Sequence, residues 1–516
     1  MKYIVTALIC FIILVLISSC RNDFEFTSST GSLKFSQDTI YLDTVFSTIG
    51  SSTRTFKVYN RSNDDIVIPR VALAQGTNSK YRISVDGVPG QVFENVELLA
   101  KDSMFVFVET TVDIMDFTGD TEFLYEDTIE FDSGANLQKV ALVTLIKDAV
   151  FLFPERDAEG IEETILLGTE EDGVRISGFF LDDNELIFTN EKPYVIYGFA
   201  GVPPNKTLAI NPGARIHFHS QSGIIVARDG TLKVNGALST TEELENEVIF
   251  EGDRLEPLYD DVAGQWAAIW LTAGSINHEI NYATIKNASV GIIMDSFNNA
   301  SNGATLKINN SKVFNSSNTA LLGTTASIEA TNSIFHNSGQ SAVVARLGGD
   351  YNFNNCTISN YWNGSFRQDP TLLISNAIPN TEFTADLTAA NFTNCIIYGD
   401  RNLELALLDD GTSTFNFKFE NSLLRFNDSS NSFDGIPAYD FSNINLYNQC
   451  ILNVDPLFEE VAAFKLRIDN TGGANGIGDP ASVTATDISG TTRSTSTVSG
   501  EGPDAGSFES SDLSGS

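Results

Sequence analysis

One pattern of apolar and polar positions recurs five times between residues 304 and 426. Each copy has apolar residues at alternate positions, then an Asn, a small residue, a variable residue and another apolar residue. The alternation predicts a short β-strand with one face turned toward a core. Because Asn tolerates the left-handed backbone conformation, it predicts a sharp bend after each strand. The five Asn positions are Asn310, Asn332, Asn355, Asn394 and Asn421.

The spacing of the copies predicts how these strands are arranged. Consecutive Asn positions are 22, 23, 39 and 27 residues apart. A period in the low twenties, with no helical pattern between copies, is typical of one solenoid coil per repeat. Equivalent residues would then stack at about 4.8 Å, Asn above Asn and apolar above apolar. The 39-residue step predicts one coil plus an excursion at residues 376–388. We therefore expect an all-β protein built around a parallel β-helix.

Changes in the pattern of apolar and polar positions predict the domain boundaries along the chain. Residues 32–148 contain strands at intervals of roughly ten residues, which predicts an immunoglobulin-like β-sandwich. Residues 149–192 are acidic and are expected to form a junction that caps the first coil, because an uncovered coil is an open sheet edge. Calcium could bind carboxylates there, although no EF-hand spacing occurs. The β-helix is expected over residues 193–458, followed by closing coils or a cap over residues 459–509 and a tail over residues 510–516.

The amino terminus carries the most specific functional signal. Lys2 precedes an apolar run over residues 3–17 that is too short to span a bilayer comfortably. The sequence Ile-Ser-Ser-Cys that ends at Cys20 resembles a bacterial lipobox, which implies a signal peptide over residues 1–19 and a lipidated Cys20. A plain signal peptide with an incidental Cys is the alternative. Residues 20–31 would then form a polar tether to the membrane.

Charge narrows the choice of partners. With 31 basic and 67 acidic residues, the net charge is −36. This charge excludes a nucleic-acid-binding role, which requires a basic surface. It also disfavours electrostatic docking on anionic lipids, so the expected contact with a membrane is the lipid anchor.

The Cys and His residues do not predict a metal site. Cys356 and Cys395 occupy the same position of the repeat and, with Cys450, are expected to be free thiols, because parallel Cβ vectors disfavour a disulfide. His217 and His219 share the outward face of a predicted strand. They could contact a transition metal, but no third ligand is evident nearby. We expect no resident cofactor.

Aromatic residues give the clearest indication of a binding site. Tyr361, Trp362 and Arg367 lie where the chain leaves the repeat, and loops on rigid scaffolds often bind ligands. Exposed Tyr or Trp rings can stack on sugars, so these three residues are the candidate glycan site. The alternative is that the aromatic rings pack the loop onto the coil. Trp266 and Trp270 are expected to fill the core.

Catalysis is the less favoured reading. A polygalacturonase-like site would need Gly-His-Gly and Arg-x-Lys, and neither occurs. A pectate-lyase-like site would need carboxylates holding calcium beside a basic residue. The pairs Asp260-Asp261 and Asp409-Asp410 fall in predicted turns with few basic residues nearby. Many parallel β-helices do degrade polysaccharides, but that analogy concerns the fold alone.

Several short segments of the mature chain match one family. They are residues 43–46, 85–87, 193–198, 264–266, 394–399, 455–458 and 504–509. Through these segments, most of the mature chain resembles a group of right-handed parallel β-helix lipoproteins from Gram-negative bacteria. The resemblance implies the fold and an outer-membrane location, with the cell-surface side favoured by acidic residues just after Cys20. It implies no catalytic residue.

These observations lead to one favoured function and two alternatives. The favoured function is that of a non-catalytic envelope lipoprotein whose β-helix binds a glycan or another surface component. A polysaccharide lyase or other carbohydrate-active enzyme is the first alternative. A purely structural envelope component is the second.

Overall fold

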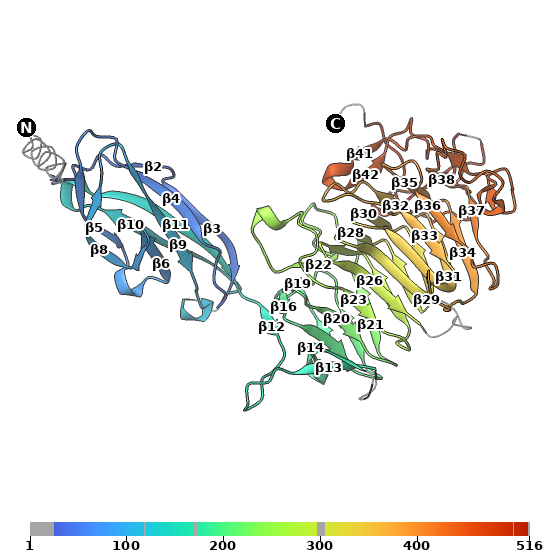
Figure 1. Cartoon of the computed structure of the whole chain (residues 1–516), viewed down its shortest axis with the longest axis horizontal. Helices are drawn as coiled ribbons and strands as arrows, with labels where there is room; N and C mark the ends of the chain where they lie inside the picture. The colour runs from blue at the N-terminus through green and yellow to red at the C-terminus, as the bar shows by residue number, and fades with distance from the viewer. Residues whose placement is uncertain are drawn as a thin grey trace, which may run out of the picture. The chain divides into compact units, whose positions relative to one another are not determined.

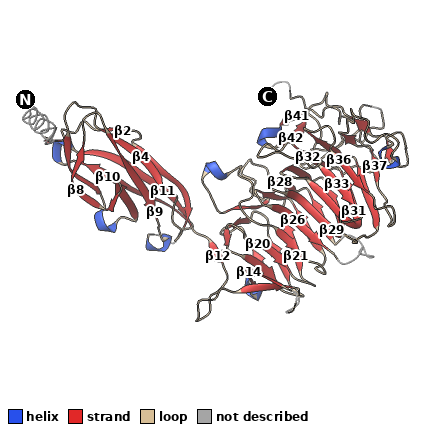
Figure 2. Ribbon diagram, in the orientation of Figure 1, coloured by secondary structure: helices blue, strands red, loops and turns tan. Residues whose placement is uncertain are grey.

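The computed structural model describes residues 25–117, 120–168, 171, 173–296, 305–498 and 500–513. The predicted signal peptide, Cys20 and the start of the tether lie outside the described residues, as does the end of the tail. Strands dominate the described chain, which confirms the all-β class (Figure 2). The chain divides between Asp148 and Ala149 into two compact units (Figure 1). Short 3₁₀ helices are η1 (Gly76–Asn78), η2 (Ile114–Asp116), η3 (Gly134–Asn136), η4 (Asp183–Glu185), η5 (Pro257–Tyr259), η6 (Pro437–Tyr439) and η7 (Val461–Ala463).

The first unit consists of two sheets that share one core. Strands recur at short intervals here, as predicted, because apolar residues alternate along them and their inward faces form a single cluster. The first sheet contains β1 (Thr27–Ser28), β5 (Ile66–Leu73), β10 (Glu122–Phe131), β11 (Gln138–Lys147) and β3 (Thr39–Phe46) in spatial order, with β8 (Val92–Leu98) beside β5. The second contains β2 (Lys34–Phe35), β4 (Arg54–Tyr59), β9 (Ser103–Thr110), β6 (Tyr81–Val85) and β7 (Val88–Gly90).

The second unit contains two large sheets of mainly parallel strands, which we call sheet I and sheet II. The chain passes through them alternately, and each strand pairs with its equivalent one passage later. We call one such passage a coil. Sheet I consists of β12 (Val150–Leu152), β16 (Tyr194–Ile196), β19 (Arg215–Phe218), β22 (Val248–Gly252), β25 (Ala283–Lys286), β28 (Lys312–Ser316), β30 (Ile334–Ser338), β32 (Thr357–Asn360), β35 (Ile396–Gly399), β38 (Leu423–Leu424) and β40 (Ile451–Leu452).

Sheet II has two parallel tracks, so a typical coil has three strand segments. In the first track are β14 (Val174–Phe180), β17 (Phe199–Val202), β20 (Gly223–Val226), β23 (Ile269–Leu271), β26 (Val290–Asp295), β33 (Leu372–Ser375) and β36 (Leu405–Leu408), with β13 (Thr164–Leu167) antiparallel to β14. In the second are β15 (Ile187–Phe188), β18 (Thr207–Ile210), β21 (Thr231–Asn235), β24 (His278–Asn281), β27 (Leu306–Asn309), β34 (Leu387–Thr393), β37 (Lys418–Glu420) and β39 (Tyr447–Asn448). The long strands β29 (Thr319–Thr331) and β31 (Val343–Asn354) contribute to both tracks.

The five repeated Asn residues form the corner between sheet II and sheet I. All have positive φ, between 48° and 52°, which confirms the predicted left-handed bend. The backbone N–H of each donates to the next coil, for example from Asn332 to the carbonyl of Asn354 at 3.0 Å. The small residue that follows donates to the carbonyl two residues earlier, as Ser333 does to Thr331 at 2.9 Å and Cys395 to Thr393 at 3.1 Å. The corner therefore satisfies much of its backbone polarity within and between coils.

The interior repeats the same residues in register. Rings at equivalent positions of successive coils stack with centroids 5.0–5.6 Å apart, in the series Phe353, Phe392, Phe419 and Tyr447. As predicted, Cys356 and Cys395 are free and buried, whereas the free Cys450 is half-buried. The predicted stacking of apolar on apolar residues is thus confirmed in this part of the chain.

The structure differs from two of the predictions about the parallel coils. Parallel pairing begins at β12, which pairs with β16, so the acidic residues 149–192 already supply strands to the first coil. The sequence did not indicate these strands, because they are short and the acidic residues around them interrupt the apolar pattern. The spacing of 39 residues between Asn355 and Asn394 is longer than one coil. Its extra residues form two excursions, at residues 361–371 and 376–386, rather than the single predicted one.

The carboxyl-terminal residues 456–509, which we call the cover segment, lie along the outer face of sheet I. The segment includes the hairpin β41 (Phe458–Glu460) and β42 (Lys465–Ile468), which Figure 1 shows beside β30 and β32. Leu466 and Ile488 pack on Ile334. Ala474 and Ala505 pack on the outward residues of later coils. The predicted cap is therefore a lateral cover that spans several coils.

The Asn corner also binds the cover segment. The Asn332 amide donates to the carbonyl of Thr486 at 2.7 Å, and the Asn421 amide donates to that of Ile477 at 3.0 Å. The Asn394 side chain accepts from the backbone N–H of Asp479 at 2.7 Å. Residues that turn the chain at each coil thus also hold the cover segment against sheet I.

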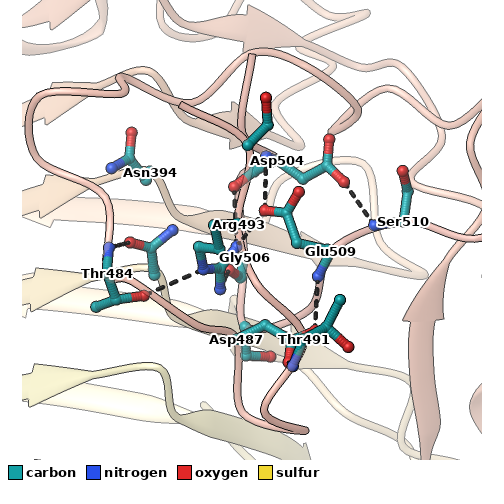
Figure 3. Close-up of polar contacts among 12 residues, drawn as sticks. Asn394, Thr484, Asp487, Thr491, Arg493, Asp504, Gly506, Glu509 and Ser510 are labelled. Carbon is teal, nitrogen blue, oxygen red and sulfur yellow. Dashed lines mark hydrogen bonds and ion pairs between the residues drawn. The ribbon is translucent and has the colours of Figure 1, made fainter. Parts of the chain in front are cut away.

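Arg493 is the centre of the polar contacts within the cover segment (Figure 3). Its side chain is fully buried and is paired with Glu509 at 3.0 Å. The guanidinium also donates to the carbonyl of Gly506 at 2.8 Å and to Asn332 Oδ1 at 3.0 Å. Burial lowers the pKa of Arg493, but its donors are matched by several acceptors, which is what a buried charge requires.

Replacing Asn332 should loosen the cover segment as well as strain the corner. We expect Asn332→Ala to lower the free energy of unfolding by roughly 3 kcal/mol, since it loses bonds to Thr486 and Arg493 and places Ala in the left-handed region. Asn310→Ala is the matched control, because Asn310 has the same φ but its side chain accepts from the Asn332 amide, at 3.2 Å, and not from the cover segment. The control should cost roughly 1–2 kcal/mol. Chemical denaturation followed by circular dichroism measures both, and equal losses would contradict the role of Asn332.

Candidate functional site

The loop predicted to bind ligand is largely occupied with its own packing. Tyr361 is half-buried, with its ring centroid 6.2 Å from those of His336 and Phe458. Burial raises its pKa. Trp362 is half-buried, and its indole N–H donates to Ser365 Oγ at 2.9 Å. The most exposed ring of the loop is Phe366, at 83%.

Arg367, the third predicted ligand contact, is buried at 4% exposure. Its guanidinium forms a two-point ion pair with the fully buried Glu404, with N–O distances of 2.8 Å and 2.7 Å. It also contacts Asp400. Burial alone would lower the pKa of Arg367, but the two carboxylates outweigh that effect and raise it. The guanidinium thus fastens residues 361–371 to the next coil, which leaves it little access to a ligand.

The histidines do not form a metal site. His217 and His219 lie opposite the core residues of β19, as expected, but His217 is buried, with Nδ1 3.6 Å from Glu251 Oε1. His219 stacks on Tyr197 at 4.6 Å, and its Nδ1 lies 2.8 Å from Asp253 Oδ2. Within the described residues, no group of three or more His, Cys, Asp or Glu side chains is arranged to hold a metal ion.

Two further histidines are buried away from these. Burial lowers the pKa of His278 to about 3; its Nδ1 accepts from the backbone N–H of Leu232 at 3.1 Å, and its Nε2 lies 2.9 Å from Ser275 Oγ. Burial likewise lowers the pKa of His336 to about 4. Both rings are therefore neutral at ordinary pH and act as packed polar groups.

Both aspartate pairs lie in turns or loops. Asp260 and Asp261 lie in an exposed turn after η5. Asp409 and Asp410 both accept from the Asn376 amide, at 3.0 Å and 2.9 Å. Bonds from Thr412 and Ser413 lower the pKa of Asp410. These contacts fit carboxylates that hold a loop in place.

A groove on the outer face of sheet II was missed by the sequence reasoning. We call it the Trp270 groove. It has a volume of about 550 Å³ and lies between the first track of sheet II and the hairpin β13–β14. Its lining residues are Ile165, Leu166, Leu167, Gly168, Phe180, Ile225, Ala227, Arg228, Trp270, Thr272, Ala273 and Asp295.

Trp270 forms the floor of this groove rather than part of the core, so that part of the sequence prediction is wrong. Trp266 is buried at 1% exposure, as predicted, whereas Trp270 is half-buried. The outward position follows from the register, because Trp270 pairs with Ile225 and Ile293 while its strand neighbours Ile269 and Leu271 point into the core. The strand has only three residues, which is too few for alternation in the sequence to show which of them face inward.

Two features fix the shape of the groove. The Trp270 indole N–H donates to Asp295 Oδ2 at 2.8 Å, which holds the ring in one orientation. Gly201 lies at an outward position of β17, and a Cβ there would approach Ile165 and Phe180 to 2.9 Å. The hairpin can therefore lie close to sheet II only because position 201 lacks a side chain. The result is an apolar floor with Arg228, Thr272 and Asp295 at its polar rim.

Comparisons with known proteins do not assign a family. No protein-family model matches the chain, and no curated protein matches it. Among solved structures, the chain is similar to part of a family 123 glycoside hydrolase from Clostridium perfringens, with 8% identity over 22% of this chain and 26% of that chain and a TM-score of 0.16. It is also similar to the E. coli chaperone DraB, with 13% identity over 24% and 58% and a TM-score of 0.16. A PapD-like domain of human CEP192 shows 14% identity over 26% and 94%, again with a TM-score of 0.16. Similarity at this level decides neither fold nor function.

The described residues contain no helix with the length and apolarity needed to cross a membrane.

Arg367→Met tests whether this residue holds the loop. We expect a loss of roughly 3–5 kcal/mol in the free energy of unfolding, because the buried Glu404 carboxylate would lose its partner. Arg156→Met is the control, since Arg156 forms an ion pair of similar length with Glu162 but its side chain is 67% exposed. That change should cost roughly 0–1 kcal/mol. Urea denaturation of the full chain compares them; similar stability of the two variants would argue against the structural role.

Proposed function

We propose that this protein is an outer-membrane lipoprotein that binds a glycan without cleaving it. In this proposal, the coils from β12 to β40 form a right-handed parallel β-helix, and an immunoglobulin-like sandwich links it to the lipid on Cys20. The coil-by-coil parallel pairing of sheets I and II supports the β-helix. The two sheets around one core support the sandwich. The lipobox-like sequence that ends at Cys20 supports the anchor, and the acidic residues just after Cys20 support the cell-surface side.

The observation that carries the binding function is the Trp270 groove. Sugar rings have apolar faces and polar edges, and the groove offers an aromatic floor with polar groups at its rim. The bond to Asp295 removes the freedom of the indole ring before a ligand arrives, which lowers the entropic cost of binding. Arg228, Thr272 and Asp295 are placed to contact hydroxyl groups of the sugar.

The rigid sheet under the groove supports this choice over the loop at Tyr361. The backbone of β23 is bonded to β20 on one side and β26 on the other, so Trp270 is positioned by regular secondary structure. In the loop, Tyr361 and Arg367 are engaged in packing and ion pairing. Trp362 stays a second candidate contact because it is half-buried at the surface.

A glycan microarray with the purified chain tests the binding function. We expect Trp270→Ala to weaken binding to the recognised glycan by about tenfold or more, equivalent to roughly 1.4 kcal/mol. Trp362→Ala is the matched control and should change the affinity little. Loss of binding in the Trp362 variant alone would place the site on the loop instead. Cleavage of the bound glycan, seen as new reducing ends or unsaturated uronates, would contradict a binding role.

Lipidation of Cys20 is tested separately. We expect the mature protein from bacterial cells to begin at a diacylglycerol-modified Cys20 and to partition into detergent, because two or three acyl chains bind a membrane stably. Cys20→Ser should abolish the lipid mass in the amino-terminal peptide and release the protein from the membrane. Mass spectrometry of that peptide is the measurement. An unmodified Cys20 in the wild-type protein would remove the anchor from the proposal.

A further inference from the structure

A second cavity lies on the other side of the unit, between sheet I and the cover segment. We call it the sheet–cover pocket. Its volume is about 780 Å³. Its floor is the outer face of β25 and β28, one wall is the chain near residues 238–244, and the other is the cover segment. A volume in this range suits a ligand of several rings.

Two lysines rise from the floor of this pocket. Lys312 Nζ lies 3.3 Å from Glu247 Oε1, and its side chain is 26% exposed. Lys286 Nζ lies 2.8 Å from Glu251 Oε2, at 22% exposure. Burial acts to raise the pKa of Glu251, but His217 and Lys286 outweigh it and lower the pKa. The Glu251 carboxylate is therefore ionised and forms an ion pair with Lys286.

Two more cations lie at the exposed edge of the pocket, on the cover segment. Strand β42 alternates, with Leu466 and Ile468 buried and Lys465 and Arg467 exposed on the opposite side. Both Lys465 and Arg467 line the pocket. Lys465 Nζ lies 3.1 Å from Glu460, and the Arg467 guanidinium is 5.9 Å from the Phe508 ring centroid. The packing of β42 against sheet I thus brings basic groups from distant parts of the chain to one cavity.

This concentration of cations is unusual for so acidic a chain. The whole protein has 31 basic residues and a net charge of −36. The pocket lining has four cations, Lys286, Lys312, Lys465 and Arg467, and four acids, Glu242, Glu247, Asp261 and Glu459. Glu251 and Glu460, which pair with Lys286 and Lys465, add two more acids. An anion entering here would contact ammonium and guanidinium donors at short range.

Aromatic rings lie beside these cations. Phe314 projects from the floor and Phe464 from the cover segment, with centroids 5.0 Å apart. Both line the pocket, as does Phe508. A ligand that satisfies this lining has a flat apolar face and a negatively charged group on the same ring.

We propose that the sheet–cover pocket binds a carboxylate-bearing sugar chain, with the lysines and Arg467 contacting the carboxylates and Phe314 and Phe464 contacting ring faces. The site is separate from the Trp270 groove, which lies on sheet II. It exists only where the cover segment lies over sheet I, so the same residues that hold the cover segment also shape the pocket.

Titration calorimetry with the full chain tests this site. The probes are tetramers of galacturonic acid and of mannuronic acid, with the methyl ester of each as the uncharged form. We expect at least one acid tetramer to bind and its ester to bind about tenfold more weakly, because the ester cannot accept a charge-assisted bond. Failure of both acids to bind, or equal binding of acid and ester, would overturn the proposal.

Variants locate the binding within the pocket. Lys465→Gln with Arg467→Gln should weaken the acid tetramer about tenfold, and both side chains are exposed, so the fold should persist. Lys312→Gln should act in the same direction, although Glu247 would lose its partner. Lys307→Gln is the matched control, since Lys307 pairs with Glu329 on sheet II. An unchanged affinity in the double variant would overturn the site.

Two further measurements separate this site from its alternatives. Trp270→Ala should leave the affinity for the acid tetramer unchanged, whatever happens to binding in the Trp270 groove; a matching loss would mean that there is one site, not two. Displacement of the tetramer by an equal concentration of inorganic phosphate would show a simple anion site and overturn the sugar assignment.

Discussion

Parallel backbone pairing between successive coils is the constraint on which the second unit depends. Each strand bonds to its equivalent one coil earlier and one coil later, so every side chain lies above a residue in the same position of the repeat. A corner must therefore turn by the same angle each time. The left-handed Asn residues supply that angle, and the hydroxyl or thiol that follows each of them satisfies a carbonyl within the same turn. The aromatic stack through Phe392 is a consequence of this register.

The outer faces of the coils differ because the core does not constrain them. In the early coils the outward residues of sheet I are charged and form ion pairs, as Glu251 does with Lys286. In the later coils they are apolar, as at Ile334, Ile396 and Leu423. Apolar outward residues need a partner that excludes water, and the cover segment provides it. The transition between these two kinds of surface is where the sheet–cover pocket lies.

Both candidate sites lie on sheet faces, whereas the sequence pointed to a loop. Trp362 and Trp270 are both half-buried, so exposure alone does not separate them. They differ in what holds them: Trp270 lies between two bonded strands and is oriented by Asp295, and Trp362 is held by Ser365 within its own loop. The sequence alone does not show what the Arg367 guanidinium contacts. An Arg in a polar loop has the same sequence context whether it binds a ligand or pairs with a buried carboxylate such as that of Glu404.

The sequence by itself determined the all-β class, the strands of the first unit and the corner at each repeated Asn. These depend on local patterns, namely alternation of apolar residues and the backbone preference of Asn, which neighbouring residues in the chain reveal directly. Only the tertiary structure decided that residues 456–509 lie along sheet I, that Arg493 joins them to Asn332, and that Trp270 faces outward. The first two depend on contacts between residues far apart in the chain. The third depends on which residues of a three-residue strand face inward. Neither dependence produces a periodic pattern in the sequence.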